Sequence, residues 1–266
     1  MPLEIVTIPC RSDNYAYLLR DEATGATGLV DAPEAGPLAA ELERRGWGLD
    51  VLLITHHHGD HVEGVEALRE RFKPQVIGAE ADRKRLPLLD RAVAEGDEIA
   101  IGASGARVLD ASGHTVGHVA FHFPEAAALF SADSLMVMGC GRIFEGTAEM
   151  MWATLVKLAG LPAETRIYSG HEYTEANLRF ALSLGEVRAP GEDPAPGEDR
   201  ALAERAGEIR ALRAAGRPTV PATLAAERAT NPFLRAGSPD MKELVGMRDA
   251  PDAEVFAEIR RRKDAF

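Results

Sequence analysis

Cysteine is scarce in this chain, with only Cys10 and Cys140 among 266 residues. Two cysteines cannot form the disulfide framework of a small secreted domain, and they cannot supply a structural zinc site built on thiolates. We expect Cys140 to be a small buried side chain rather than a catalytic thiol. No apolar run is long enough to span a bilayer, and the first residues lack the basic and then apolar pattern of a signal peptide. We therefore expect a cytoplasmic protein with no membrane partner.

Basic residues are also in deficit. Lys and Arg number 30 against 42 Asp and Glu, which gives a formal net charge of -12. Nucleic-acid binding needs a concentrated basic surface, so we expect no nucleic-acid partner. The chain is 45% hydrophobic, which is ordinary for a globular protein, and 266 residues can fold as one large or two modest domains. We expect a monomer, and a weak homo-oligomer stays open as the alternative.

Histidines, in contrast, are concentrated in one place. The run THHHGDH at residues 55–61 directly follows a short apolar stretch that predicts a buried strand. On an extended backbone, side chains two residues apart point the same way, so His56 and His58 can bind one metal ion. The glycine then lets the chain turn, and Asp60 and His61 can reach a second ion. This one loop can therefore serve two metals.

Further donors come later in the chain, each at or just beyond a strand-like stretch. They are His114 in SGHTVGH, Asp133 in LFSAD and His171 in IYSGH. Chance clustering of these residue types on solvated loops is the alternative, but the ordered arrival of all four segments favours a metal centre. Counting donors assigns His56, His58 and His114 to one ion and Asp60, His61 and His171 to the other, with Asp133 bridging them.

This donor set leaves coordination positions open for water, as in a catalytic rather than a structural zinc centre. We therefore expect two divalent metal ions per chain. Imidazole and carboxylate donors suit zinc, iron and manganese alike, and zinc is our default.

The HxHxDH run and the later GHT, SAD and GHE segments resemble the metallo-β-lactamase fold superfamily. More narrowly, the chain resembles the hydroxyacylglutathione hydrolases, also called glyoxalase II, over nearly its whole length. That narrower resemblance rests on GCGR with FEG at residues 139–146, SGHEYT at 169–174, NPFLR at 231–235 and the basic run RRRKD at 260–264. It implies an α/β fold with a four-layer αββα sandwich, followed by a smaller helical domain. We place the catalytic domain at residues 1–170 and the helical domain, which contributes to glutathione binding, at 171–266.

The hydrophobic patterns agree with this architecture, with strands and helices mixed in the first part and helices alone after about residue 170. The predicted strands lie at residues 5–8, 15–19, 28–31, 51–54, 75–78, 107–109, 119–123 and 128–131. The predicted helices lie at residues 37–45, 62–72, 173–184, 200–214, 239–245 and 252–262. An acidic segment rich in Pro and Gly at residues 188–199 contains PGED twice and predicts a surface loop that departs from the family pattern.

The resemblance implies a metal-dependent thioester hydrolase. Its substrates would be S-(2-hydroxyacyl)glutathiones, chiefly S-D-lactoylglutathione, converted to glutathione and D-lactate in methylglyoxal detoxification. We expect a metal-bridging hydroxide to attack the thioester carbonyl, with Asp60 and Asp133 as the catalytic carboxylates. The chief alternative is a glutathione persulfide dioxygenase of the same fold, which uses one iron and oxygen. The same metal ligands would also suit a β-lactamase, or a metal-binding protein that keeps the fold without turnover.

The resemblance also implies which residues contact glutathione: Arg142, Phe144, Tyr173, Arg260 and Lys263. Family members commonly have lysine where Arg142 stands and tyrosine where Phe144 stands. The compact ammonium is therefore replaced by a planar guanidinium at Arg142, and the phenolic hydroxyl is missing at Phe144. The basic run near the chain end has a simpler alternative, because cations favour the C-terminal end of a helix. His57, His118 and His122 do not fit the ligand pattern, so packing or hydrogen bonding behind the ligands is the expected role, with His118 the best candidate.

Overall fold

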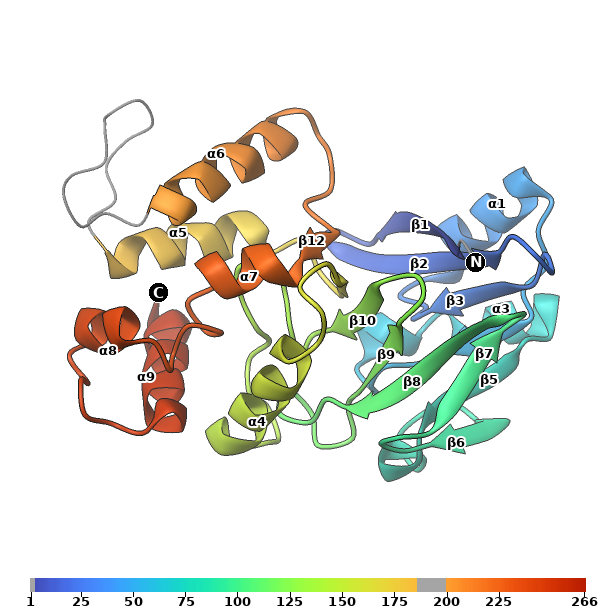
Figure 1. Cartoon of the computed structure of the whole chain (residues 1–266). Helices are drawn as coiled ribbons and strands as arrows, with labels where there is room; N and C mark the ends of the chain where they lie inside the picture. The colour runs from blue at the N-terminus through green and yellow to red at the C-terminus, as the bar shows by residue number, and fades with distance from the viewer. Residues whose placement is uncertain (1–2, 186–199) are drawn as a thin grey trace.

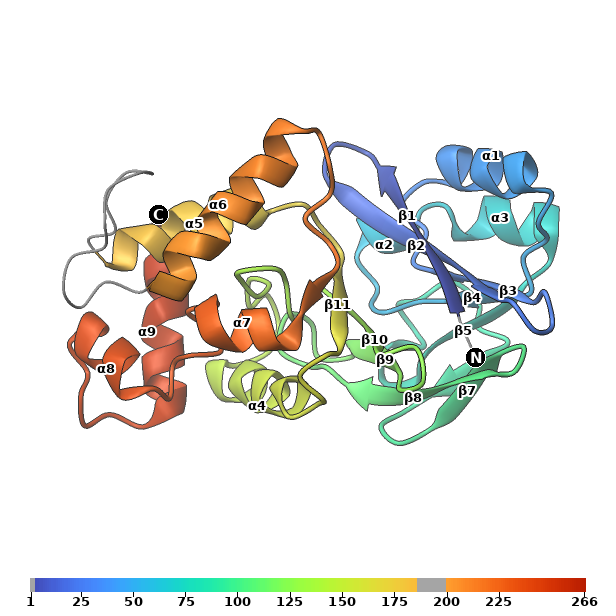
Figure 2. The same cartoon turned by 45° about the horizontal axis from the view of Figure 1, so that its top comes forward.

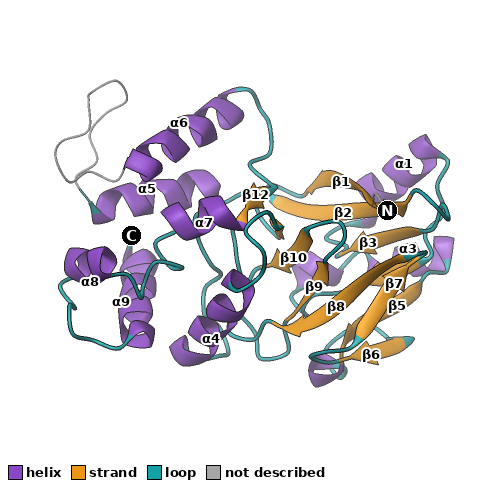
Figure 3. Ribbon diagram, viewed as in Figure 1, coloured by secondary structure: helices purple, strands orange, loops and turns teal. Residues whose placement is uncertain are grey.

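The computed structural model describes residues 3–185 and 200–266. In this part of the chain two six-stranded sheets lie face to face, and helices cover their outer sides (Figure 1). The strands gather at one end of the molecule and the C-terminal helices at the other (Figure 3). The predicted sandwich with a helical C-terminal part is confirmed.

The first sheet joins an antiparallel N-terminal hairpin to a parallel half. Its strands in spatial order are β1 (Leu3–Cys10), β2 (Asn14–Asp21), β3 (Thr27–Val30), β4 (Val51–Leu53), β5 (Gln75–Ala79) and β6 (Arg91–Val93). Successive side chains of β2 enter different clusters: Tyr17 and Leu19 face the second sheet, whereas Ala16 and Leu18 face outward. Helices α1 (Ala35–Arg45) and α3 (Val65–Phe72) bury their apolar stripes on that outward face (Figure 2).

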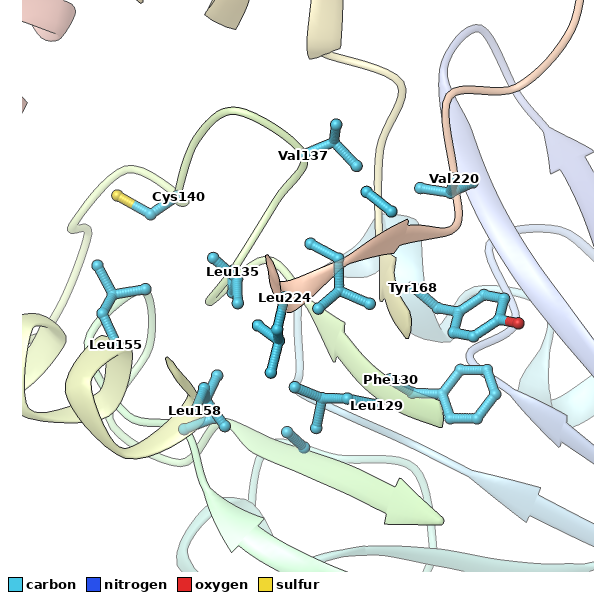
Figure 4. Close-up of a cluster of buried hydrophobic side chains, with 14 of the residues drawn as sticks. Leu129, Phe130, Leu135, Val137, Cys140, Leu155, Leu158, Tyr168, Val220 and Leu224 are labelled. Atoms are coloured by element: carbon cyan, nitrogen blue, oxygen red, sulfur yellow. The ribbon is translucent and has the colours of Figure 1, made fainter. Parts of the chain in front are cut away.

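The second sheet is antiparallel except where β10 pairs with β11. In spatial order it contains β12 (Ala222–Thr223), β11 (Arg166–Ser169), β10 (Ala128–Ala132), β9 (Val119–Phe123), β8 (Ser104–Asp110) and β7 (Glu98–Ile101). A parallel pair needs a crossover, and helix α4 (Ala148–Ala159) lies in the connection from β10 to β11. Leu155 and Leu158 of this helix pack near Leu129 and Leu224, while Phe130 points away toward the first sheet (Figure 4).

The C-terminal part is largely helical and packs beside the open end of the sandwich. Its helices are α5 (Thr174–Leu184), α6 (Arg200–Ala214), α7 (Leu224–Thr230), α8 (Pro239–Val245) and α9 (Asp252–Ala265). Two short helices elsewhere are α2 (Gly59–Val62) and η1 (Glu80–Asp82). Within the described residues, no helix is long and apolar enough to cross a membrane.

Most of the predicted elements exist, and the errors have physical reasons. The helix predicted over residues 62–72 is divided into α2 and α3 at Gly64, where a Cβ would lie 2.8 Å from backbone atoms of Glu34 and Ala35. The prediction of helices alone after residue 170 is wrong, because β12 extends the second sheet. Short strands β6 and β7 and helices α4 and α7 had not been predicted. The PGED segment lies outside the described residues.

A buried polar cluster joins the C-terminal part to the loop after β10. Asn231 donates from Nδ2 to the carbonyl of Gly139 at 3.0 Å and to Glu227 Oε2 at 3.0 Å, and its Oδ1 accepts from the backbone N–H of Phe233. Glu227 Oε2 also accepts from the backbone N–H of Met138 at 2.7 Å. Met138 has a left-handed φ of 60°, a costly conformation for a side chain of this kind, and these bonds hold it.

We expect Asn231→Ala to lower the free energy of unfolding by about 2–4 kcal/mol, because several buried polar groups lose their partner at once. Urea unfolding at fixed metal content measures this. Gln75→Ala removes a side chain of similar size from an exposed position and is the matched control. If the urea midpoint of Asn231→Ala equals that of the control, the stabilising role of this polar cluster is contradicted.

Candidate active site

The predicted donors converge at the edge between the two sheets where several strands end. The run at residues 55–61 follows β4, His114 lies between β8 and β9, Asp133 follows β10, and His171 follows β11. Ends of neighbouring strands meet at one sheet edge, which is where α/β proteins usually build their sites. The start of the histidine run is anchored by Asp31, which accepts from the backbone N–H of Thr55 at 2.9 Å and from its hydroxyl at 2.8 Å.

Three of the imidazoles form a first compact donor group. His58 Nδ1 lies 3.1 Å from His56 Nε2 and 3.0 Å from His114 Nε2. His56 and His114 are buried, and His58 is partly open to the cleft. The three ring nitrogens are close enough together to hold one ion.

The second donor group lies beside the first and combines two imidazoles with a carboxylate. His61 Nε2 is 3.4 Å from His171 Nε2, and Asp60 Oδ2 is 3.3 Å from His171 Nε2. His61 and His171 are buried, whereas the Asp60 side chain keeps 34% of its surface exposed toward the cleft. This group again brings its donor atoms within reach of one ion.

Asp133 lies between the two groups. Its Oδ2 is 3.4 Å from His114 Nε2 in one group and 3.4 Å from His171 Nε2 in the other, and its Oδ1 is 3.6 Å from His61 Nε2. The Oδ1 atom is buried without a hydrogen-bond partner. A buried carboxylate oxygen surrounded by imidazole nitrogens fits a bound cation, and the donor set is compatible with a dinuclear metal site.

The protonation preferences of the imidazoles differ between the two donor groups. Burial lowers the pKa of His56 well below its usual value and also lowers that of His114. The hydrogen bond from His171 holds the pKa of Asp60 below its usual range, and the positive charges of His61 and His171 outweigh burial to do the same for Asp133. Burial opposes a charge on His171, but the carboxylates around it, chiefly Asp133, raise its pKa to about 11. Ionised carboxylates bind metals, and an arriving ion would release the proton of His171.

The three other histidines near these segments lie behind or away from the donors. His57 Nδ1 is 3.0 Å from Asp82 Oδ2, so it is held by a carboxylate outside the cluster. His118 stacks on His56 with ring centroids 4.7 Å apart, and neither of its ring nitrogens has a hydrogen-bond partner. The packing role expected for His118 therefore fits, and the hydrogen-bonding role does not. His122 lies on β9, outside the donor groups.

A cleft of about 870 Å³ opens over the donors. All five residues expected to contact glutathione line it: Arg142, Phe144, Tyr173, Arg260 and Lys263. The Phe144 ring is 61% exposed, and its centroid lies 5.6 Å from that of His58. The Tyr173 ring stacks on His171 at 4.6 Å. Aromatic surfaces therefore border both donor groups.

Helix α9 divides the basic run near the chain end between two faces. Arg261 and Arg262 pair with Glu258 on the surface, as a basic helix end would. Arg260 instead donates to the carbonyl of Cys140 at 3.0 Å, and Lys263 donates to the carbonyl of Ala176 at 2.9 Å. Two of the four cations therefore face the cleft.

Comparison with known proteins bears on this arrangement. A family model described as metallo-beta-lactamase superfamily matches residues 11–171, and one described as hydroxyacylglutathione hydrolase C-terminus matches residues 172–266. A protein of Ruegeria pomeroyi named hydroxyacylglutathione hydrolase is 60% identical over 266 residues, covering 100% of both chains. Proteins of the same name from Cereibacter sphaeroides and Roseobacter denitrificans are 59% and 52% identical, also over 100% of both chains. The chain belongs to the hydroxyacylglutathione hydrolase family.

Solved structures share the fold of this hydrolase family member more widely. BLEG-1, a B3 metallo-beta-lactamase, superposes with a TM-score of 0.64 at 21% identity, covering 87% of this chain and 99% of its own. ETHE1 from Myxococcus xanthus gives 0.61 at 24% identity, covering 100% and 99%. TTHA1623, crystallised in a di-iron-bound form, gives 0.58 at 26% identity, covering 87% and 100%. The first two likenesses show the fold alone.

Several contacts that complete the site had escaped prediction. Asp31 accepts from His61 Nδ1 at 2.8 Å, and the carbonyl of Arg142 accepts from His114 Nδ1 at 2.7 Å. Asp13 and Asn14 contact His171 and Asp60. No spacing rule pointed to these residues, since each lies far from its partner along the chain. Such contacts fix the tautomer and orientation of a metal-binding histidine.

Gly170 gives a direct test of how tightly the donors are packed. A Cβ at this position would lie 2.3 Å from Asp133 Oδ1 and 2.7 Å from His61 Cε1. We expect Gly170→Ala to push both side chains from their places, lowering metal content below that of the parent protein and turnover by about tenfold or more. Elemental analysis and initial rates measure these effects. Gly36→Ala, where a Cβ meets open space, is the control. Equal metal content in the two variants would contradict the tight packing of Gly170 against the donors.

Proposed function

We propose that this chain hydrolyses S-(2-hydroxyacyl)glutathiones, chiefly S-D-lactoylglutathione, to glutathione and the 2-hydroxy acid. The observation that carries the proposal is the meeting, in one cleft, of two complete metal-donor groups with a cluster of cations from α9 and the loop after β10. Full-length relatives with the hydrolase name support it. The role belongs to methylglyoxal detoxification.

We assign the donors as the sequence predicts. The first ion takes His56, His58 and His114, the second takes Asp60, His61 and His171, and Asp133 is shared; zinc remains our default, with iron and manganese as alternatives. When bound, two such ions polarise a carbonyl oxygen and lower the pKa of a water toward neutrality.

The chain's own residues then direct the reaction. The Asp60 side chain is open to the cleft, so its carboxylate is placed to orient the attacking water, and Asp133 keeps the two donor groups together. The water oxygen bonds to the thioester carbonyl carbon, and the carbon–sulfur bond breaks. Glutathione leaves as a thiolate with an ordinary thiol pKa of about 8.5, so it needs no general acid to depart.

The substrate would be bound by the cations of the cleft. Glutathione carries two carboxylates and one ammonium, and a chain with net charge -12 must attract such an anion through a local cluster. Arg142, Arg260 and Lys263 form that cluster, and Tyr173 and Phe144 supply its aromatic sides. Residues 1–170 would then contribute most metal donors, and residues 171–266 would contribute His171 and most glutathione contacts.

The alternative activities fit the site less well. A glutathione persulfide dioxygenase uses one iron, so the second donor group would have no role there. A β-lactamase would have no use for the cations that α9 directs into the cleft. Neither alternative accounts for the full set of residues that line the site.

The decisive experiment is the initial rate of thioester loss from S-D-lactoylglutathione. Purified protein should hydrolyse it, lose activity when stripped by a chelator, and regain it with zinc, iron or manganese. Oxygen uptake with glutathione persulfide and cleavage of a chromogenic cephalosporin are parallel assays. Protein with two bound metals but no thioester hydrolysis would overturn the proposal.

Lys263 gives this proposal a specific pH dependence. Burial, followed by the charges of Arg260 and Arg179, lowers its pKa to about 8. Below that pH the ammonium attracts the anionic substrate, and above it the charge is lost, so kcat/KM should fall as pH rises through about 8. Arginine keeps its charge at this pH, so Lys263→Arg should remove the fall in kcat/KM. The rates are corrected for alkaline hydrolysis of the thioester. Identical profiles for both proteins would exclude the role.

A further inference from the structure

The turn between β1 and β2 reaches across the first sheet to the second donor group. Asp13 Oδ1 lies 2.9 Å from His171 Nδ1, on the side of the ring opposite the metal-facing nitrogen. The next residue, Asn14, donates from Nδ2 to Asp60 Oδ2 at 3.1 Å and to the Asp60 carbonyl at 3.0 Å. Two consecutive residues, the last of the turn and the first of β2, therefore hold two of the proposed metal donors.

The backbone fixes this turn in place. The N–H of Glu172 donates to the Asp13 carbonyl at 2.8 Å, and the N–H of Tyr15 donates to the Gly170 carbonyl at 2.8 Å. Asn14 forms an antiparallel bridge with His171, and its side chain is buried with 4% exposed. The turn is therefore attached on both sides of His171 and has little freedom to move away from it.

The first donor group is held by different residues. Thr55 Oγ1 lies 3.0 Å from His56 Nδ1, and the carbonyl of Arg142 accepts from His114 Nδ1. Among the described residues, the side chains of Asp13 and Asn14 contact no donor of this group. Of the two donor groups, the turn therefore orients only the second, and Asp13 also interacts with the Tyr173 hydroxyl.

We propose that Asp13 and Asn14 are positioning residues that set the metal affinity of the Asp60–His61–His171 group. This inference rests on the dinuclear centre of the proposed function. Asp13 accepts from the Nδ1–H of His171, which holds the ring in place with Nε2 as the nitrogen that faces the ion. Asn14 cannot ionise, and by donating to Asp60 Oδ2 it fixes the rotation of that carboxylate and holds this oxygen 3.3 Å from His171 Nε2.

The test is a zinc titration of chelator-stripped, full-length protein against a competing chromogenic chelator. The parent protein should show two dissociation constants for zinc. In Asp13→Ala one of the two dissociation constants should rise by about 10- to 100-fold while the other stays unchanged, and Asn14→Ala should raise the same one. Asp13→Asn keeps an oxygen that accepts from Nδ1–H, so it should recover part of the affinity. Gln75→Ala, an exposed change on β5 away from the donors, is the control and should match the parent.

The outcomes separate a positioning role from a structural one. Unchanged constants in Asp13→Ala and Asn14→Ala would overturn the inference. An equal rise of both dissociation constants would also overturn it, because general damage to the fold weakens zinc binding at both sites. If Asp13→Ala fails to fold, the isosteric Asp13→Asn variant decides. One of its zinc dissociation constants should still rise about tenfold, and two unchanged dissociation constants would overturn the inference.

The same experiment distinguishes this inference from the proposed function. Parent protein that binds two zinc ions without hydrolysing S-D-lactoylglutathione would remove the function but leave the binding test intact. Parent protein that hydrolyses the thioester while Asp13→Ala binds zinc normally would remove only the inference. Parent protein that binds fewer than two zinc ions would overturn both the dinuclear centre and the inference built on it.

Discussion

The site depends on one buried carboxylate shared between two groups of imidazoles. An isolated buried carboxylate is strongly disfavoured, so Asp133 is tolerable only with cationic partners around it. It follows a bulge in β10, after Ala132 with a left-handed φ of 40°, a strained conformation that directs it into the site. Gly170 and Gly141 leave it room, since a Cβ at Gly141 would lie 2.1 Å from the Asp133 carbonyl. The strand ends, the glycines and the strain all serve the placement of this side chain.

The two donor groups differ in what supports them. The first is held by residues adjacent in the chain or in the loop that lines the cleft, such as Thr55 and the carbonyl of Arg142. The second is held by residues from the first sheet, with Asp31 behind His61 and the turn at Asp13 behind His171. His171 is also the point where the sandwich passes into the helical part, and Tyr173 stacks on it. The second group therefore joins the sheets, the helices and the cleft, so its geometry is sensitive to all three.

The convergence of these side chains could be predicted from the sequence because they are local or follow strand-like stretches. The spacing of His56 and His58, and the glycine before Asp60, carry their geometry within one loop. The residues behind the donors could not be predicted in this way: Asp13 and His171 are 158 positions apart, and only the tertiary fold brings them together. Among the elements, α6 and α8 lie at the predicted residues, whereas β12 has two residues and no periodicity to detect. For β12 the pairing with β11, rather than a local pattern, decides the structure.

The charge of the cleft is more balanced than its cations suggest. Asp264 Oδ1 accepts from Arg260 at 2.8 Å and from Arg142 Nε at 3.3 Å, so one carboxylate holds both guanidinium groups. The Arg260 side chain is 9% exposed, and Asp264 limits the cost of burying its charge before a substrate arrives. A substrate carboxylate must then compete with Asp264 or share these groups with it, which favours ligands that place a carboxylate at the correct distance from the metal donors over anions in general. On the proposed function, selectivity in this acidic protein would thus arise from paired cations held in fixed positions more than from total positive charge.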